Sequence, residues 1–494
     1  MTTSRQNKTM PTPLNRIRSL KTRPLARSSS WVLYWMTSFR RAGSNFALDR
    51  AIEHAVALRK PLVVLEALRV GYPHANDRLH TFILQGMAEN ARRFRGSAVC
   101  YYPYVEAIAG AGKGLVEALA AKASVVVVDD WPCFFVPRMQ AALVSRVEVL
   151  VEAVDSNGLY PMHDTQRVFT TAHSFRVHLQ KTLAPFLREL PDESPLEGLK
   201  LPQVELPRAI TSRWPQAQKG LLTAEPSAIA ALPIDHTVPA VTIVGGSQAA
   251  EARARLFVTT RLDNYVEARN EPELDGTSAL SPYLHFGHLS AHQVFRAVAK
   301  RESWRVETLG KSIGGAKAGW WKLSAPAEAF IDQLVTWREL AFNLTSHRPD
   351  EYDTLESLPQ WAIQTHRLHA ADKREHLYPL ADFEQARTHD PLWNAAQRQL
   401  VRDGWFHNYL RMLWGKKILE WSKTPQVAFD TMNHLMSKYS LDGRDPVSYA
   451  GSLWVLGRYD RAWGERPIFG KVRFMSSINT AKKISVKGYL KKYA

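Results

Sequence analysis

The chain has 494 residues, which is too long for one hydrophobic core and predicts two domains. Hydrophobic residues make up 45% of the sequence, yet no uninterrupted apolar stretch is long enough to span a membrane. The formal net charge of +17 favours a polyanionic partner, nucleic acid first, although a basic enzyme with a solvated surface would have the same composition. Only Cys100 and Cys133 are present, so a disulfide framework and a zinc quartet are excluded, and a reducing cytoplasm is expected.

The first part of the chain predicts a basic arm followed by an α/β domain. Residues 1–28 are basic, rich in Ser, Thr and Pro, and lack the apolar core of a secretory signal, so we expect a disordered arm. Residues 29–184 alternate apolar strand-sized runs with helix-spaced ones, which is typical of a doubly wound parallel sheet. Strands are expected at 31–36, 61–68, 98–104, 124–130 and 147–154, and helices at 45–58, 79–94 and 115–122.

The second part of the chain predicts a connector and an all-helical domain. Proline recurs through residues 185–246, which indicates a segment that wraps the surface between two domains. From residue 247 to residue 494 the apolar spacing is helical throughout, and Asp390 followed by Pro391 is a clear helix start. Helices are expected at 249–264, 290–300, 326–344, 390–403, 405–421 and 425–436.

Two motifs suggest other chemistries but lack the residues that those chemistries need. The glycine cluster at 110–114 lies between a strand and a helix, yet it lacks the Lys-Ser/Thr pair and the spacer of a phosphate loop. His285, His288 and His292 have no carboxylate at ligand spacing beside them, so packing or phosphate contact is favoured over a metal site. No metal is therefore expected, and no nucleophile elbow for hydrolysis is present.

A turn that precedes a predicted helix carries the hydroxyls of Thr277, Ser278 and Ser281. Backbone amides and hydroxyls in such a turn suit a pyrophosphate group. A helix start that is capped only by its own side chains explains the same residues, and the pattern leaves both interpretations open.

Tryptophans are concentrated in the helical half. Trp414 and Trp421 are seven residues apart on one predicted helix, which places them on one face about 10 Å apart along its axis. Trp393 lies on the preceding helix. Such a series can carry an oxidising hole from a buried acceptor toward the surface, whereas the alternative is that the rings only fill a helical core.

Six segments of the helical half form a distinctive set, namely LSPYLHFG at 280–287, WREL at 337–340, THDPLWNAAQ at 388–397, RMLWGKKILEW at 411–421, LDGRDP at 441–446 and RPIFGKVR at 466–473. Through these segments the helical half closely resembles the class II cyclobutane pyrimidine dimer photolyases from about residue 261 to residue 493. The first half resembles them only loosely, at 34–36, 45–48 and 125–130.

The resemblance implies a U-shaped FAD in the helical domain, with light-driven electron donation from reduced flavin to a dimer that is flipped out of UV-damaged DNA. Arg338 and Asn408 would lie near the cofactor, and Arg411 would pair with Asp442 beside the flavin ring. The residues implied at the flavin diphosphate are Tyr265, Thr277, Ser278, Leu280 and Ser281.

The resemblance also implies an electron path and a DNA-binding wall. Trp414, Trp393 and Trp421 match the photoreduction chain of the family from proximal to distal. The residues implied at the lesion or the DNA are Trp337, Trp454, Met412, Arg461 and Arg473. Aromatic walls of this kind replace the stacking that an everted base pair loses, and arginines neutralise phosphates, so binding is expected to fall with salt.

Three departures from the family alter these expectations. Gln333 stands where class II members generally carry a glutamate, so it can donate hydrogen bonds to the dimer but cannot deliver a proton. Met436 stands where the family has an asparagine facing flavin N5, and we expect less accumulation of flavin radical under blue light. The loop at 37–44 also differs, which leaves open whether the α/β domain holds an antenna chromophore such as a deazaflavin.

Two functions from different classes therefore remain. The first is a monomeric cytoplasmic lyase that repairs pyrimidine dimers in DNA with light. The alternative is a photolyase-derived blue-light receptor, cryptochrome-like, that binds FAD but repairs weakly or not at all. Gln333 and Met436 favour the receptor, whereas Trp337, Trp454 and the basic charge favour repair. A weaker third possibility is a nucleic-acid-binding protein with a vestigial flavin pocket.

Overall fold

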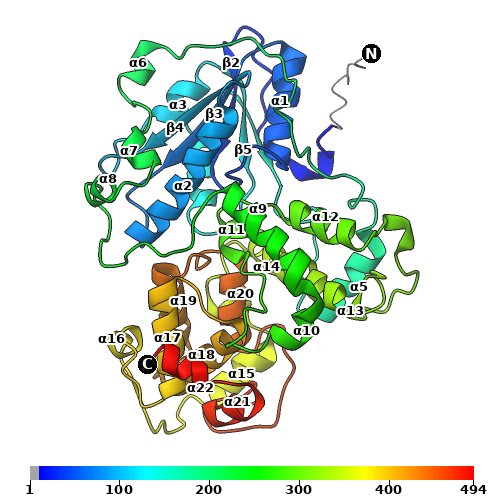
Figure 1. Cartoon of the computed structure of the whole chain (residues 1–494), viewed down its shortest axis with the longest axis vertical. Coiled ribbons are helices and arrows are strands. Elements are labelled where there is room, and N and C mark those ends of the chain that lie inside the picture. The colour runs from blue at the N-terminus through cyan, green and yellow to red at the C-terminus, as the bar shows by residue number, and fades with distance from the viewer. Residues whose placement is uncertain (1–10) are drawn as a thin grey trace. The chain divides into compact units, whose positions relative to one another are not determined.

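The structure is a computed structural model that describes residues 11–494 (Figure 1). The chain forms two compact units. Among the described residues, the α/β unit contains residues 11–165, together with Leu183–Ala252 and Pro282–Ala297. The helical unit contains Gln166–Thr182, Arg253–Ser281 and Val298–Ala494. Each unit is made of several separate stretches of chain, so the units do not follow one another along the sequence.

The α/β unit is built on a six-stranded sheet with the strand order β1-β6-β5-β2-β3-β4. Strands β2 to β6 run parallel to their neighbours and β1 is antiparallel to β6, so the predicted doubly wound fold class is confirmed. The parallel strands are almost continuous apolar runs because helices cover both faces of such a sheet. The strands are β1 (Ile17–Lys21), β2 (Trp31–Met36), β3 (Leu62–Leu68), β4 (Val99–Val105), β5 (Ala123–Asp129) and β6 (Leu150–Val154).

Part of the predicted disordered arm is ordered. The segment Ile17–Lys21 forms the edge strand β1, in which Ile17 pairs with Val154. The prediction of disorder was wrong for residues 11–28 because local composition does not reveal a strand that is stabilised by pairing with a distant one. The rest of the predicted arm, residues 1–10, lies outside the described residues.

The helices of the α/β unit lie around this sheet, and the proline-rich connector belongs to the same unit. Connector residues Ile210 and Trp214 are buried in the sheet's hydrophobic core, so the connector contributes to the unit's stability. The helices are η1 (Leu14–Arg16), α1 (Phe46–Leu58), α2 (Asp77–Phe94), α3 (Leu115–Ala120), α4 (Val136–Val144), α6 (Arg208–Thr211), α7 (Lys219–Leu222) and α8 (Pro226–Ala230).

The helical unit follows the predicted helical spacing, but two of the expected helices are divided. The expected helix at 249–264 consists of α9 (Ser247–Leu256), a π-helical stretch η2 (Phe257–Arg261) and the 3-10 helix η3 (Leu262–Asn264). The expected helix at 326–344 is divided into α13 (Ala325–Ile331), a π-helical stretch η5 (Asp332–Trp337) and α14 (Arg338–His347). The other helices of this unit are α5 (Ala172–Thr182), α10 (Tyr265–Ala268), η4 (Val306–Thr308), η6 (Leu355–Ser357), α15 (Gln360–Leu368), α16 (Leu380–Glu384), α17 (Pro391–Asp403), α18 (Asn408–Trp421), α19 (Pro425–Tyr439), α20 (Pro446–Val455), α21 (Ser477–Lys483) and α22 (Lys487–Lys492).

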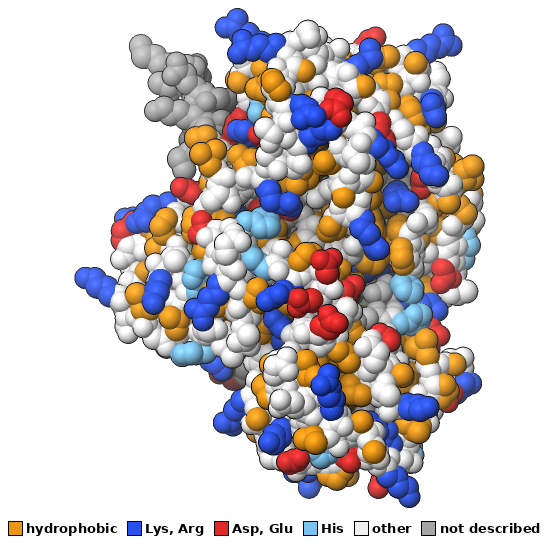
Figure 2. All heavy atoms as spheres, turned by 180° about the vertical axis from the view of Figure 1, so that it is seen from behind, with side chains coloured by type: hydrophobic (Ala, Val, Ile, Leu, Met, Phe, Trp, Pro, Cys, Tyr) orange, Lys and Arg blue, Asp and Glu red, His pale blue; other side chains and the backbone are white. Residues whose placement is uncertain are grey.

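Three helices contain residues of both units, namely α9 (Ser247–Leu256), α11 (Ser281–His285) and α12 (Ala291–Arg301). Within the described residues 11–494, none of the helices combines the length and the apolar character that crossing a membrane requires. On the face shown in Figure 2, Lys and Arg side chains are spread widely, with hydrophobic and acidic side chains between them.

Candidate functional site

A cavity of about 820 Å³ lies within the helical unit. This volume falls within the range of pockets that hold cofactor-sized ligands. Its walls come from α5, α13, η5, α18, α19 and α20 and from the segment that follows α20. The predicted site residues that line it are Gln333, Trp337, Asn408, Arg411, Met412, Trp414, Met436, Trp454, Arg461 and Arg473.

Helix α18 supplies one wall of the cavity through a single face. Asn408, Arg411, Met412 and Gly415 all line the cavity, and their spacing of three and four residues places them along one side of the helix. A Cβ atom on Gly415 would lie 2.5 Å from Val455 Cγ2. The glycine therefore lets α18 pack closely against α20.

The π-helical stretch η5 presents Gln333 and Trp337 to the cavity. π-helical turns inside α-helices are frequent at functional sites. Asp332 fixes this stretch to α5 because its carboxylate accepts two hydrogen bonds from Arg176, at 2.6 and 3.0 Å. Both side chains of this ion pair are largely buried. The position of the two cavity residues thus depends on a contact with a distant segment.

An ion pair joins Arg411 to Asp442, as the resemblance implies, with a shortest distance of 3.2 Å. Burial opposes the charge on Asp442, but attraction to Arg411 and hydrogen bonds from the hydroxyls of Ser440 and Ser281 hold its pKa below the ordinary value. Arg411 Nε is buried and has no hydrogen-bond partner among residues 11–494. One donor of the pair is therefore left unpaired, on a side chain that lines the cavity.

Three tryptophans form a continuous series of adjacent rings that begins at the cavity, in which Trp414 and Trp393 are parallel and Trp393 meets Trp421 edge to face at 67°. The ring centroids of Trp414 and Trp393 are 6.3 Å apart with an interplanar angle of 3°, and those of Trp393 and Trp421 are 6.0 Å apart. Trp393 Nε1 also donates a hydrogen bond of 3.0 Å to the backbone oxygen of Trp414. Trp414 lines the cavity and all three rings are buried, so the rings are held rigidly at fixed separations.

A second wall consists of aromatic rings and cations. Trp454 lines the cavity, with Arg473 Cζ 5.7 Å from its ring centroid. Arg473 is oriented by two hydrogen bonds to Asp460, at 2.7 and 3.1 Å, and also lies over Trp463. Arg461 is exposed beside the same Trp463 ring. These positively charged side chains border an aromatic surface at the cavity.

Several predicted cofactor residues lie outside the cavity lining. Tyr265 is buried against Phe330, and Arg269, which does line the cavity, lies over its ring. The backbone oxygens of Thr277 and Ser278 accept hydrogen bonds from Arg253, at 3.1 and 2.7 Å. Others outside the lining are Leu280 and Arg338, which are buried, and Ser281, which contacts Asp442.

The sequence analysis missed two buried charged side chains, one at the cavity and one behind its wall. Glu328 is buried at the cavity, where one oxygen accepts a hydrogen bond from Gly319 N and the other has no partner within the described part of the chain. Lys416 is fully buried behind Trp454, with its Nζ 4.8 Å from the ring centroid. No clear signal in the sequence marked Lys416, because α18 also carries Arg411, Lys417 and Glu420.

Residues of the glycine cluster and of the histidine motif form hydrogen bonds with other residues of the α/β unit. The backbone amides of Gly110 and Gly112 both donate to Glu106, each at 3.1 Å, so the glycine loop binds a carboxylate of its own chain. His288 accepts a hydrogen bond from Gly246 N, and burial lowers its pKa to about 3. This histidine is thus a neutral, packed side chain.

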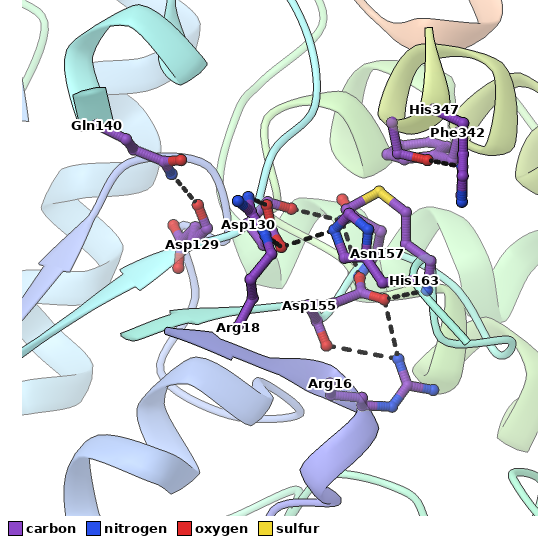
Figure 3. A network of polar contacts seen from close by, with 12 residues as sticks. Arg16, Arg18, Asp129, Asp130, Gln140, Asp155, Asn157, His163, Phe342 and His347 are labelled. Atoms are coloured by element: carbon purple, nitrogen blue, oxygen red, sulfur yellow. Dashed lines mark hydrogen bonds and ion pairs between the residues drawn. The ribbon is translucent and has the colours of Figure 1, made fainter. Parts of the chain in front are cut away.

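A polar network lies at the end of β5 in the α/β unit (Figure 3). Asp129 accepts hydrogen bonds from the backbone amides of residues 37, 38 and 39 and from the Tyr34 hydroxyl. Asp130 binds Arg18 through two hydrogen bonds and also contacts His163. These contacts hold the loop after β2 and the edge strand β1 in place.

Comparison with known proteins agrees with this architecture. The fold is similar to that of a crystallised class III photolyase from Agrobacterium tumefaciens, with a TM-score of 0.66 and 18% identity over 94% of this chain and 86% of that one. The chain therefore has the photolyase/cryptochrome fold. No protein-family model matches the chain.

Relatives in sequence define the family more closely. The chain is 30% identical over 476 residues to the deoxyribodipyrimidine photo-lyase of Methanothermobacter thermautotrophicus, which covers 96% of this chain and 97% of the relative. It is 33% identical over 477 residues to that of Oryza sativa subsp. japonica, covering 93% and 86%. The chain belongs to the deoxyribodipyrimidine photo-lyase family, so the predicted family and enzyme class are confirmed.

Proposed function

We propose that the chain repairs cyclobutane pyrimidine dimers in UV-damaged DNA, that it is a class II enzyme, and that it uses FAD bound in the cavity of the helical unit. This proposal rests on the observation that two features lie at the same cavity. An aromatic and cationic wall, with Trp454 and Arg473, lies at the same cavity as Trp414, where the buried tryptophan series begins.

The residues at the cavity suit a flavin. Arg411 offers a buried donor without a partner among residues 11–494, and Met432 and Met436 supply apolar surface. Arg411 and Asn408, which line the cavity, would hold the ring system together with Asp442. By the family resemblance, the rest of the cofactor would extend beyond the cavity lining to Tyr265, Thr277, Ser278, Leu280, Ser281 and Arg338. When bound in its reduced form, flavin would supply the electron that light drives into the dimer.

The aromatic wall suits an everted pair of pyrimidines. A damaged pair is poorly stacked and costs less to remove from the duplex than an intact one. Trp337 and Trp454 would replace the lost stacking on the two bases. Arg461 and Arg473 would neutralise phosphates of the opened strand, with Met412 beside the bases, so affinity would fall as salt rises.

The tryptophan series would serve as an electron path between Trp421 and the cavity. The three rings follow one another at centroid distances of 6.3 and 6.0 Å without an intervening side chain in the path. Trp414 Nε1 donates a hydrogen bond of 2.9 Å to Gln397, which fixes the ring nearest the cavity. The same series also fills the helical core, and both roles are compatible.

Illumination of the purified protein with an oligonucleotide that contains one dimer tests the repair function. We expect restored adjacent thymines, a flavin absorption spectrum from the protein, and no repair in the dark. A flavin-loaded and chemically reduced protein that leaves the dimer intact under blue light would contradict the proposal.

The variant Trp414→Phe separates the electron path from repair. Because the ring beside the cavity would no longer be readily oxidised, we expect slow photoreduction of oxidised flavin but normal repair once the cofactor is reduced chemically. Trp304→Phe is the matched control, since Trp304 lies on the loop after α12. Photoreduction at the wild-type rate in Trp414→Phe would show that the proposed tryptophan path does not carry the electrons.

A blue-light receptor is the second candidate function, and two cavity residues favour it. Gln333 cannot protonate a dimer, and Met436 presents a thioether to the cavity where an amide would be expected. Asn433, one turn earlier, accepts a hydrogen bond of 2.9 Å from Ser452. Flavin photochemistry without measurable repair would favour this candidate over the lyase.

A further inference from the structure

Lys416 is a fully buried lysine in the middle of α18. A buried ammonium is costly unless it is paired or hydrogen-bonded, so its position calls for a physical explanation. Two adjacent positions on the same helix, Trp414 and Gly415, line the cavity, whereas Lys416 lies behind the wall formed by Trp454 and Val455.

The amine of Lys416 holds the end of α20. Its Nζ donates a hydrogen bond of 2.6 Å to the backbone oxygen of Val455, the last residue of that helix. Carbonyl groups in the last turn of a helix lack partners within the helix, and a positive charge there is favoured by the helix dipole. Lys416 therefore acts as a side-chain cap for the helix that carries Trp454.

The same amine contacts the Trp454 ring. Nζ lies 4.8 Å from the ring centroid, within the distance at which a cation is attracted to an aromatic face. Arg473, at 5.7 Å from the same centroid, is the other cation beside this ring. The indole is therefore held by one buried amine and by one arginine from the segment that follows α20.

The charges that face Lys416 come from two elements. Asp460 attracts the ammonium, and Arg473 opposes it, and both belong to the segment after α20. His366 on α15 also interacts with it electrostatically. Burial has the largest effect and lowers the pKa of Lys416 to about 7, so the side chain changes its charge near neutral pH.

We propose that Lys416 is a positioning residue for the lesion-binding wall, which fixes Trp454 from behind and places a positive charge next to it. This inference rests on the proposed function, because Trp454 is taken as the surface on which an everted pyrimidine pair stacks. Protonated Lys416 polarises the indole and contributes to the positive potential of the wall. Loss of that proton removes the charge while the hydrogen bond to Val455 can persist.

Binding of damaged DNA is therefore expected to depend on pH. As pH rises through about 7, where Lys416 loses its proton, the affinity for a dimer-containing strand should decrease. The affinity for an undamaged strand should change less, because it depends on exposed arginines that stay charged.

Fluorescence anisotropy with a labelled single strand, with and without one dimer, tests this inference in the dark at constant salt. Lys416→Met keeps the approximate size of the side chain but removes the charge and the hydrogen bond. We expect it to lower the preference for the damaged strand by up to about tenfold, the scale of a desolvated cation–π contact, and to abolish the pH step. Lys423→Met is the matched control, since Lys423 is exposed just beyond the same helix.

Lys416→Gln keeps a donor for the Val455 oxygen without a charge, so it separates the two roles. We expect it to retain the fold and part of the preference for damaged DNA but to lack the pH step. A pH step that persists in Lys416→Gln, or a wild-type preference and step in Lys416→Met, would overturn the inference. A wild-type protein without any preference for the damaged strand would instead count against the proposed function itself.

Discussion

The buried carboxylate of Asp129 in the α/β unit differs from two buried polar groups at the cavity of the helical unit in how completely it is paired. At the end of β5, Asp129 accepts hydrogen bonds from three backbone amides and from Tyr34, so the chain itself satisfies the carboxylate. At the cavity of the helical unit, Arg411 Nε and Glu328 Oε1 are buried without partners among the described residues. A buried polar atom left unpaired is costly, so the second arrangement is expected where a ligand completes it.

Glu152 of the α/β unit and Lys416 of the helical unit show the same difference in how their charges are paired. In the α/β unit, Glu152 is surrounded by Arg50 and His54, which contact its two oxygens at 2.8 and 2.9 Å. In the helical unit, Lys416 has no carboxylate within salt-bridge distance among residues 11–494, and its hydrogen bond goes to a backbone oxygen. Paired charges stabilise a fold over a wide pH range, whereas a buried unpaired amine titrates near neutral pH.

The largest effect is expected in the α/β unit. Asp129→Ala would leave three backbone amides and the Tyr34 hydroxyl without their acceptor, and we expect the free energy of unfolding to fall by about 3–5 kcal/mol. Urea unfolding of the purified variant measures this loss. Glu148→Ala is the control, because that side chain is 74% exposed and its ion pairs contribute little. A loss as small as that of the control would mean that the network does not hold the loop after β2.

A smaller effect is expected at the cavity wall, and on binding rather than on stability. Trp454→Ala should weaken binding of a dimer-containing strand by about 1–3 kcal/mol, the value of one base–aromatic stacking contact. Anisotropy titration in the dark checks this loss, with an undamaged strand as the reference. An equal loss for both strands would show that Trp454 contributes to general DNA affinity and not to the recognition of damage.

The two units are also expected to show pH dependences of the same sign but in different pH windows. Burial opposes the charge of Glu152, but Arg50 and His54 outweigh it and lower its pKa to about 2, so the folded state binds fewer protons than the unfolded state. Its contribution is complete above the ordinary value of 4.5 and is lost as the pH falls toward about 2. In the helical unit, Lys416 releases its proton at about 7 when folded, so the free energy of unfolding should rise with pH above that value.

Unfolding measured over a pH series with Glu152→Gln and Lys416→Met checks these two slopes. Glu152→Gln should flatten the acidic limb, and Lys416→Met should flatten the rise above neutral pH. A variant that keeps the wild-type slope in its own window would show that its side chain does not cause that slope.

The sequence by itself determined the features that depend on neighbours along the chain. The apolar run Val125–Val128 predicted a buried strand, and Asp390 before Pro391 predicted the start of α17, where the Asp390 side chain accepts from two backbone amides. The spacing of Trp414 and Trp421 placed both on one helix, now α18. These predictions succeeded because hydrophobic period and capping act within a few residues.

Only the tertiary structure decided which segments meet. The parallel approach of Trp393 to Trp414, the contact of Ser281 with Asp442 and the burial of Lys416 against Val455 each join residues from different elements. The edge strand β1 and the π-helical stretch η5 were likewise missed. Strand β1 is stabilised by pairing with β6, and η5 is fixed by the ion pair of Asp332 with Arg176, and both contacts are with distant segments. Local patterns set the periodicity of a segment, but contacts between distant segments depend on how the whole interior packs.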